Sequence, residues 1–309
     1  MPTCWSCWKP TARPVPMTDL PRSDPPLPAA APARRAPPGA CDAHIHMLAG
    51  PDEAPLMEGR VEDPAAGWDF AAYLDAYRAQ MAVLGTERTV VVQSILHGTD
   101  NALTLRAVEA LGRDAARAVV LVTADASEGH LDALAEAGAV AVRLNYVHGG
   151  VLDWDGVERL APRLAARGMH VQMLARAEDH MAELAPRIAA LPVPVVLDHM
   201  AWPDAARGAD APGFAALRRL LADGRAWVKL SAPYRVAAAP FDAVEGHQRA
   251  LLEANPERCL WGSDWPQIML GGAARADAGA LLDAFDRACP SEATRRRVLV
   301  DNPAALYGF

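Results

Sequence analysis

The chain has 309 residues, 51% of them hydrophobic, and a formal net charge of -8 at pH 7. This length and apolar content suit one large domain or two ordinary ones. The negative charge and the short basic runs, such as Arg295-Arg296-Arg297, exclude a typical nucleic-acid-binding protein. No run approaches the roughly twenty apolar residues of a membrane span, so we expect no membrane partner. Five scattered cysteines favour a reducing compartment, and we expect a cytoplasmic protein.

The composition changes near residue 40. Residues 1–40 are rich in proline and alanine and show neither helical nor alternating periodicity, which predicts a disordered extension. Residues 41–309 are patterned throughout, so we expect them to form a single catalytic domain.

Within that domain, short apolar runs alternate with longer amphipathic stretches, such as 69–84, 153–167 and 177–190. Near-continuous apolar runs are typical of parallel strands that are covered on both faces. The predicted strands span 41–47, 88–95, 118–124, 139–145, 170–174, 194–199, 226–231 and 259–264. This α/β pattern predicts a TIM barrel, the (β/α)8 fold.

The carboxyl ends of the predicted strands carry the candidate site, because TIM-barrel chemistry takes place there. His44 and His46 are two residues apart on the first strand, so both imidazoles project to the same side. His199 follows the sixth strand and Asp264 the eighth. Together they predict an enzyme, and we expect the long segment 48–68 to form a loop over the mouth.

Several motifs follow one another in order along residues 40–309. They include Asp42-Ala43-His44-Ile45-His46, Val142-Arg143-Leu144-Asn145, Leu197-Asp198-His199-Met200 and Trp261-Gly262-Ser263-Asp264-Trp265-Pro266. In this order and spacing they resemble the amidohydrolase superfamily, within it the branch of 2-pyrone-4,6-dicarboxylate lactonase and related sugar-lactone and muconolactone hydrolases. The resemblance implies a hydrolase that opens a small carboxylated lactone.

Metal use is the central question about this site. His44, His46, His199 and Asp264 suffice in number to bind zinc. Metal-using members of the superfamily typically add a Lys after the fourth strand or a His after the fifth, where this chain has Arg143 and Gln172-Met173-Leu174. Arginine cannot lose its proton to become a ligand. We therefore predict a site without a metal cofactor, as the lactonase branch also implies.

Without a metal, the same residues still provide a hydrolytic mechanism. Asp264 can take a proton from the attacking water and pass it to the leaving oxygen. The three histidines can direct N–H groups at the lactone carbonyl oxygen and stabilise its growing negative charge.

Two arginines are candidates for binding a substrate carboxylate, because a guanidinium donates two parallel hydrogen bonds to one. These are Arg143 and Arg235, and an internal ion pair is an equally good interpretation for Arg235.

Three further residues are expected near the substrate. Ser94 and His97 can contact its other side, although His97 can equally fix its loop through Asp100 or Asn101. Tyr234 can reach the pocket or cap its rim.

The chain departs from the dicarboxylate lactonase pattern at two places. That pattern predicts another Arg after the fourth strand and a Tyr near the end of the fifth, where this chain has His148-Gly149-Gly150 and Met173-Leu174. We therefore expect a pocket for fewer or differently placed carboxylates, more apolar on that side.

Other functions remain open at this stage. The same His and Asp cluster suits a zinc- or manganese-dependent hydrolase or decarboxylase. A sugar-lactone isomerase or a barrel that only binds a metabolite is also compatible with the sequence, because a fold does not determine a function.

Overall fold

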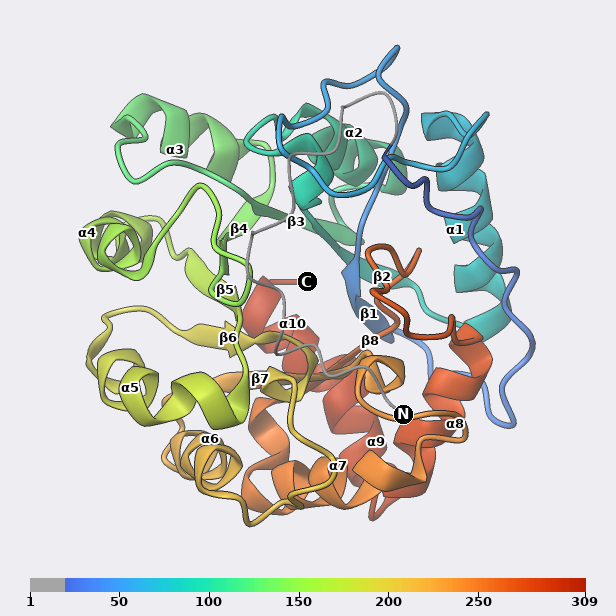
Figure 1. Cartoon of the computed structure of the whole chain (residues 1–309), viewed down its shortest axis with the longest axis vertical. Helices are drawn as coiled ribbons and strands as arrows, with labels where there is room; N and C mark the ends of the chain where they lie inside the picture. The colour runs from blue at the N-terminus through green and yellow to red at the C-terminus, as the bar shows by residue number, and fades with distance from the viewer. Residues whose placement is uncertain (1–19) are drawn as a thin grey trace.

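The structure, a computed structural model, describes residues 20–309. In this part of the chain, eight parallel strands form one sheet whose spatial order follows the sequence. They are β1 (Cys41–Ile45), β2 (Arg88–Val92), β3 (Ala116–Val120), β4 (Ala139–Asn145), β5 (His170–Leu174), β6 (Val195–Leu197), β7 (Trp227–Ser231) and β8 (Cys259–Gly262). The prediction of a TIM barrel is confirmed (Figure 1).

Helices surround the sheet (Figure 1). They are α1 (Phe70–Leu84), α2 (Ala102–Leu111), α3 (Glu128–Glu136), α4 (Trp154–Ala165), α5 (Ala177–Ala190), α6 (Pro212–Ala222), α7 (Asp242–Ala254), α8 (Ala278–Ala288), α9 (Glu292–Arg296) and α10 (Asn302–Tyr307). Helix α4 begins where the Asp153 side chain accepts a hydrogen bond from the Gly156 N–H, and it buries Val157, Leu160 and Leu164 at helical spacing.

The strands separate two apolar cores. Val90 and Val92 of β2 belong to the core inside the barrel, whereas Val91 packs in the core between sheet and helices. Successive side chains of a strand point to opposite faces. Because both faces are covered, the strands are apolar at nearly every position.

The barrel closes where the end of β8 meets β1. The Asp264 N–H donates to the His44 carbonyl over 3.0 Å, and the His46 N–H donates to the Trp265 carbonyl over 2.7 Å. This approach needs a glycine, since a Cβ at Gly262 would lie 2.8 Å from the backbone nitrogen of His44. The closure therefore brings Asp264 beside the paired histidines.

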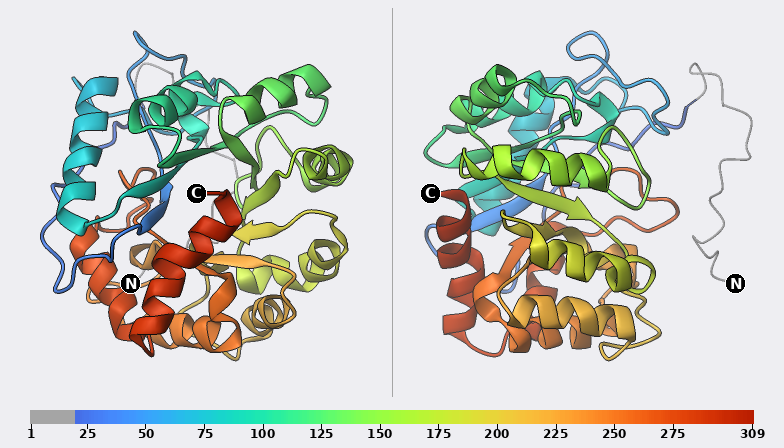
Figure 2. Two further views of the ribbon diagram at one scale, coloured as in Figure 1. Left: turned by 180° about the vertical axis from the view of Figure 1, so that it is seen from behind. Right: turned by 90° about the vertical axis from the view of Figure 1, so that its left-hand side faces the viewer.

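The opposite end of the barrel is covered by the C-terminal segment. Figure 2 shows α10 and the C-terminus on the side away from the strand tips. Arg117 donates to the Tyr307 carbonyl over 3.0 Å, and its Cζ lies 4.8 Å from the Phe309 ring. The candidate site is thus reached from the carboxyl ends of the strands.

His170 lies at the covered end and makes stability depend on pH. Its side chain is buried, its ring lies 5.6 Å from that of Tyr307, and burial lowers its pKa to about 3. The unfolded chain, with a His pKa near 6.5, binds a proton that the folded chain excludes, so stability falls as pH drops from about 6.5 towards 3.

The free energy of unfolding therefore changes with pH, and we expect His170→Phe to reduce this slope by roughly 1.4 kcal/mol per pH unit. Urea unfolding at about pH 7 and pH 5 measures the slope. His130→Phe, at an exposed histidine, is the matched control. Equal slopes in wild type and His170→Phe would contradict this account.

The prediction of disorder for residues 1–40 needs correction over part of its length. Residues 20–40 follow an extended path and bond to distant segments: Ser23 N–H to the Asp63 carbonyl (2.8 Å), Ala30 N–H to the Asp277 carboxylate (2.7 Å) and Ala33 N–H to the Asp283 carboxylate (2.8 Å). Composition indicates only that a segment lacks internal partners, and here the barrel provides them. Residues 1–19 lie outside the described residues.

The predicted loop lies beside the mouth and is held to the β2–α2 connection. Met57 N–H donates to the Leu96 carbonyl over 2.7 Å. Residues 20–23 form backbone hydrogen bonds to Asp63, near the other end of the loop. Among the described residues, no helix combines the length and the apolar character needed to cross a membrane.

Candidate active site

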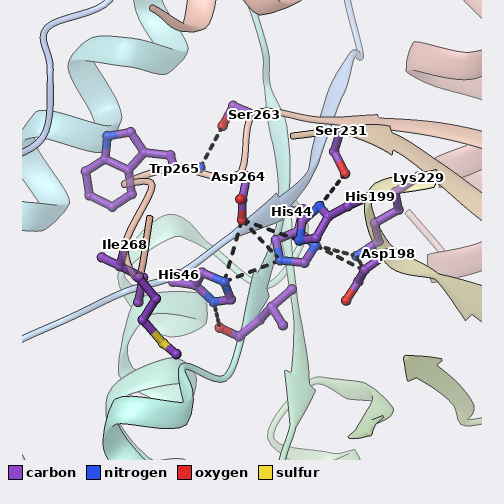
Figure 3. A network of polar contacts seen from close by, with 12 residues as sticks. His44, His46, Asp198, His199, Lys229, Ser231, Ser263, Asp264, Trp265 and Ile268 are labelled. Atoms are coloured by element: carbon purple, nitrogen blue, oxygen red, sulfur yellow. Dashed lines mark hydrogen bonds and ion pairs between the residues drawn. The ribbon is translucent and has the colours of Figure 1, made fainter. Parts of the chain in front are cut away.

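Four side chains converge at the carboxyl ends of three strands (Figure 3). Oδ1 of Asp264 lies 3.6 Å from Nε2 of His44, 3.8 Å from Nε2 of His46 and 3.8 Å from Nε2 of His199. The two Nε2 atoms of His44 and His46 are 3.4 Å apart. All four side chains are buried, so the structure brings together the residues that the sequence placed at separate strand ends.

Strained backbone positions two of these side chains. His199, Met200 and Ala201 have φ values of 55°, 57° and 52° and begin two residues after the end of β6, and Asp264, two residues after the end of β8, has a φ of 56°. Residues other than glycine rarely adopt this conformation, and it is often found at functional sites. The short left-handed turns direct His199 and Asp264 towards the centre of the barrel mouth.

A buried ion pair determines the orientation of His44. Its Nδ1 lies 3.1 Å from Oδ1 of Asp198, which lies 3.4 Å from Nζ of Lys229. Lys229 also donates to Oε1 of Gln172 over 2.6 Å, and Nε2 of Gln172 lies 3.2 Å from Asp198. Nζ of Lys229 also lies 3.3 Å from Nδ1 of His44, but the Asp198 carboxylate is nearer and only accepts hydrogen bonds, so we assign the proton of His44 to Nδ1. Neutral His44 therefore presents a lone pair at Nε2.

His46 has the same tautomer for a different reason. Its Nδ1 donates to the Val92 carbonyl over 2.8 Å, because a carbonyl can only accept. Nε2 of His46 then presents a lone pair to Nε2 of His44 and to Asp264. The centre between these three side chains is surrounded by acceptors, so it is complementary to a water molecule or a cation.

This geometry changes one expectation from the sequence. Neutral His44 and His46 have no N–H left to direct at a lactone carbonyl. His199 differs, since its Nδ1 lies 2.8 Å from Oγ of Ser231, a hydroxyl that can donate to it. His199 can thus carry its proton at Nε2 and remain a donor.

The second oxygen of Asp264 is fully bonded. Oδ2 accepts from the Tyr234 hydroxyl over 2.5 Å and from Nε and Nη2 of Arg235, both over 3.2 Å. Arg235 also donates to the carbonyls of Ile268 and Met269. Arg235 thus forms the internal ion pair and also lines the cavity, whereas Tyr234 bonds to Asp264 and is not among the cavity-lining residues.

Burial determines the protonation states of the site. It lowers the pKa values of His44 and His46, and that of His199 to about 3, so all three imidazoles are neutral near pH 7. Burial favours protonated Asp264, but His199, Arg235 and His44 outweigh it and hold the pKa of this carboxyl below its usual range. The centre thus combines neutral imidazoles with an ionised carboxylate.

A cavity of about 50 Å³ opens onto these residues. Ser94 and Arg143 line it, as predicted, together with the apolar side chains of Ile95, Leu174, Ile268 and Met269. Nη1 of Arg143 donates to the Gln93 carbonyl over 2.6 Å, and its buried Nε has no partner among the described residues. The Arg143 guanidinium therefore has donors available to a substrate.

His97 does not line this cavity, which corrects its expected substrate contact. Its Nδ1 donates to the Pro55 carbonyl over 2.9 Å. His97 fixes the loop at the mouth, although through Pro55 and not through Asp100 or Asn101.

A larger cavity of about 660 Å³ is lined by residues of the loop at the mouth, by Asp69 and by Arg22. Asp52, Glu53 and Trp68 are among its lining residues, and none of the four converging side chains borders it. Size alone therefore does not identify the reactive site in this protein.

The charges that line the cavity do not cancel. Among the charged residues that line the cavity, Arg143 and Arg235 are positive and Asp264 is negative, so its lining has one positive charge in excess. Lys229, Asp198 and Asp42 are buried but do not line the cavity, and Lys229 is paired with Asp198. Uncompensated buried charge is costly, and an anionic ligand would neutralise it. The site is thus electrostatically suited to a carboxylate or an oxyanion.

The donor atoms also fit a divalent metal ion. Nε2 of His44, Nε2 of His46 and an oxygen of Asp264 lie within 4.8 Å of one another, and both nitrogens present lone pairs. Imidazole and carboxylate are ordinary ligands for such ions. The excess of positive charge opposes the binding of a further dication.

The comparisons agree with the family resemblance of the sequence. The amidohydrolase family model matches residues 41–309. The chain is 34% identical over 294 residues to 2-pyrone-4,6-dicarboxylate hydrolase of Comamonas testosteroni, covering 89% of this chain and 92% of that one. It is 32% identical over 280 residues to 4-sulfomuconolactone hydrolase of Hydrogenophaga intermedia, covering 88% and 89%.

A solved structure supports the same assignment. It is the apo structure of a protein from Agrobacterium tumefaciens, which superimposes with a TM-score of 0.74 at 28% identity and covers 90% of this chain and 99% of that one. The match to the family model and these similarities extend over nearly the whole described barrel. The chain belongs to the amidohydrolase family.

Proposed function

We propose that the chain is a hydrolase that opens a small carboxylated lactone, with Asp264 accepting the proton of the attacking water. The observation that carries this proposal is the acceptor-lined centre of His44, His46 and Asp264, which opens onto a cavity whose lining has one positive charge in excess. Two relatives, named as hydrolases of a pyrone dicarboxylate and of a sulfomuconolactone, support the substrate class.

Binding would begin at Arg143. Its side chain and that of Ser94 line the cavity, where a guanidinium and a hydroxyl can bind a substrate carboxylate. The apolar side chains of Leu174 and Ile268 would contact the ring. This arrangement places the lactone carbonyl next to the converging histidines and Asp264.

Water activation follows from the tautomers. A water molecule in the centre donates one hydrogen bond to Oδ1 of Asp264 and one to the lone pair of His44 or His46. As the water oxygen attacks the carbonyl carbon, its proton passes to Asp264. The Nε2–H group of His199 stabilises the resulting oxyanion.

Ring opening completes the reaction. The tetrahedral intermediate collapses, the bond between the carbonyl carbon and the ring oxygen breaks, and Asp264 returns the proton to that oxygen. The product is a hydroxy acid, which is ionised near neutral pH. Each turnover therefore consumes one water and releases one proton to the medium.

The experiment is a pH-stat assay on a panel of lactones with and without a ring carboxylate. We expect turnover of at least one carboxylated lactone, and faster turnover than of its neutral analogue. A product of unchanged mass would indicate an isomerase, and saturable binding without turnover would indicate a binding protein. Either result would overturn the proposal.

Metal independence is a separate part of the proposal. If a divalent metal ion is held, its ligands would be His44, His46 and Asp264, and it would supply a Lewis acid that lowers the pKa of bound water. The excess of positive charge supports the view that Asp264 and the imidazoles act without it.

We therefore expect activity to persist within about twofold after exhaustive chelation, because no step needs a Lewis acid. Elemental analysis of the chelated protein must accompany the assay, with a known zinc hydrolase treated in parallel as the control. Loss of activity that zinc or manganese restores would contradict metal independence.

A further inference from the structure

Arg176 follows β5 and immediately precedes α5, on the side of the barrel where the sequence predicts an apolar pocket. Its backbone N–H donates to Nδ1 of His180 over 3.0 Å, which holds the turn in place. The side chain is partly buried. The turn therefore fixes the point from which this guanidinium extends.

The guanidinium of Arg176 has no charged partner. Among residues 20–309, no carboxylate lies within 4.0 Å of it, and its side chain donates no hydrogen bond. Arg235 differs, because its donors are taken up by Asp264 and by two carbonyls. Arg187, at the end of α5, is paired with Asp155 and Glu158. An arginine with unused donors at a site is available to a ligand.

The guanidinium of Arg176 lies over Trp202, which lines the cavity. Cζ of Arg176 lies 5.2 Å from the centre of the Trp202 ring, and Cζ of Arg235 lies 5.7 Å from it. Trp202 lines the cavity beside His148, whose ring lies 5.7 Å away. The stacking contact restricts the side chain without using any of its N–H groups.

The positive charge of Arg176 affects His148, which lines the cavity. Partial burial, and then the guanidiniums of Arg176, Arg235 and Arg143, lower the pKa of His148. His148 therefore stays neutral near pH 7 and adds no fourth positive charge. Positive charge is concentrated between the end of β4 and the turn after β6.

We propose that Arg176 is a specificity-determining residue that binds an anionic substituent of the substrate, remote from the bond that is hydrolysed. The inference rests on the proposed function and narrows its substrate class to lactones with such a substituent on the side of β5 and β6. Arg143 serves the carboxylate deeper in the pocket, and Arg176 binds the group at the rim.

The test compares Arg176→Gln with Arg159→Gln, which removes the same charge from the exposed surface of α4. For a lactone with two anionic groups, we expect Arg176→Gln to raise KM about tenfold with kcat within about twofold, the effect of one charge-assisted hydrogen bond. For the analogue whose rim carboxylate is a methyl ester, KM should stay unchanged. Arg176→Lys should recover part of the loss.

A merely structural role for Arg176 would lower activity on both substrates or lower kcat, and that result would overturn the inference. Equal KM values of Arg176→Gln and Arg159→Gln for the lactone with two anionic groups would also overturn the inference.

Citrate binding, measured by calorimetry, separates this inference from the proposed function. Absence of turnover in the wild type would reject the function. An equal citrate affinity of wild type and Arg176→Gln would reject the role of Arg176.

Discussion

Replacing Asp264 with Asn is expected to lower kcat/KM by about 10³-fold, because the amide cannot accept the proton of the attacking water. Asn has nearly the same shape, and its oxygen can still accept from Tyr234 and Arg235, so the fold should survive. Initial rates at saturating and limiting substrate measure the loss. Both kcat and kcat/KM should fall, since the interaction belongs to the transition state.

Asp210→Asn is the matched control for this experiment. The Asp210 side chain is exposed and pairs only with Arg218 among the described residues, so its loss should leave activity unchanged. Circular dichroism of both variants checks that the barrel is intact. An Asp264→Asn enzyme with more than about a tenth of wild-type activity would show that another group accepts the proton.

Replacing Lys229 with Met is expected to lower the free energy of unfolding by about 3–5 kcal/mol. Lys229 and Asp198 are both fully buried, and Asp198 would be left with a negative charge that only neutral groups contact. Ionic partners now hold the pKa of Asp198 well below its usual range despite its burial. Chemical denaturation at neutral pH measures the cost.

The double variant Asp198→Asn/Lys229→Met distinguishes a lost charge pair from a lost side chain. It removes both charges, so it should be more stable than Lys229→Met alone. Its activity should stay low, because an amide at residue 198 no longer forces the proton of His44 onto Nδ1. A double variant as unstable as Lys229→Met would mean that packing, and not charge, accounts for the cost.

The sequence predicts the barrel because the strands are apolar on both faces and the helices carry striped patterns. The ends of the strands are harder to predict from the sequence than their positions. The run 118–124 suggests a strand through Ala124, yet β3 ends at Val120. Leu121 and Val122 are buried beyond it, so burial and pairing in the sheet do not coincide. Apolar periodicity indicates burial alone.

The convergence of the four site residues was also predictable. His44 and His46 share one side of a strand, and closure of an eight-stranded barrel brings the last strand beside the first. The left-handed backbone at His199 and Asp264 was not predictable, because neither turn contains the glycine or asparagine that usually signals it.

The network beneath His44 was missed, although the sequence contains a signal for it. Lys229 lies in the middle of the apolar strand Trp227–Ser231, and a buried lysine requires a carboxylate partner. Asp198, directly before His199, is that partner. Arg176 carries no comparable signal, because only the fold brings it next to Trp202.

The most direct test of the account is a single turnover experiment in water enriched in heavy oxygen, with a carboxylated lactone as substrate. The account predicts that the product gains one heavy oxygen in its new carboxylate and that one proton is released, with neither event in Asp264→Asn over the same reaction time. A product without heavy oxygen, or equal incorporation by the Asp264→Asn protein, would contradict it.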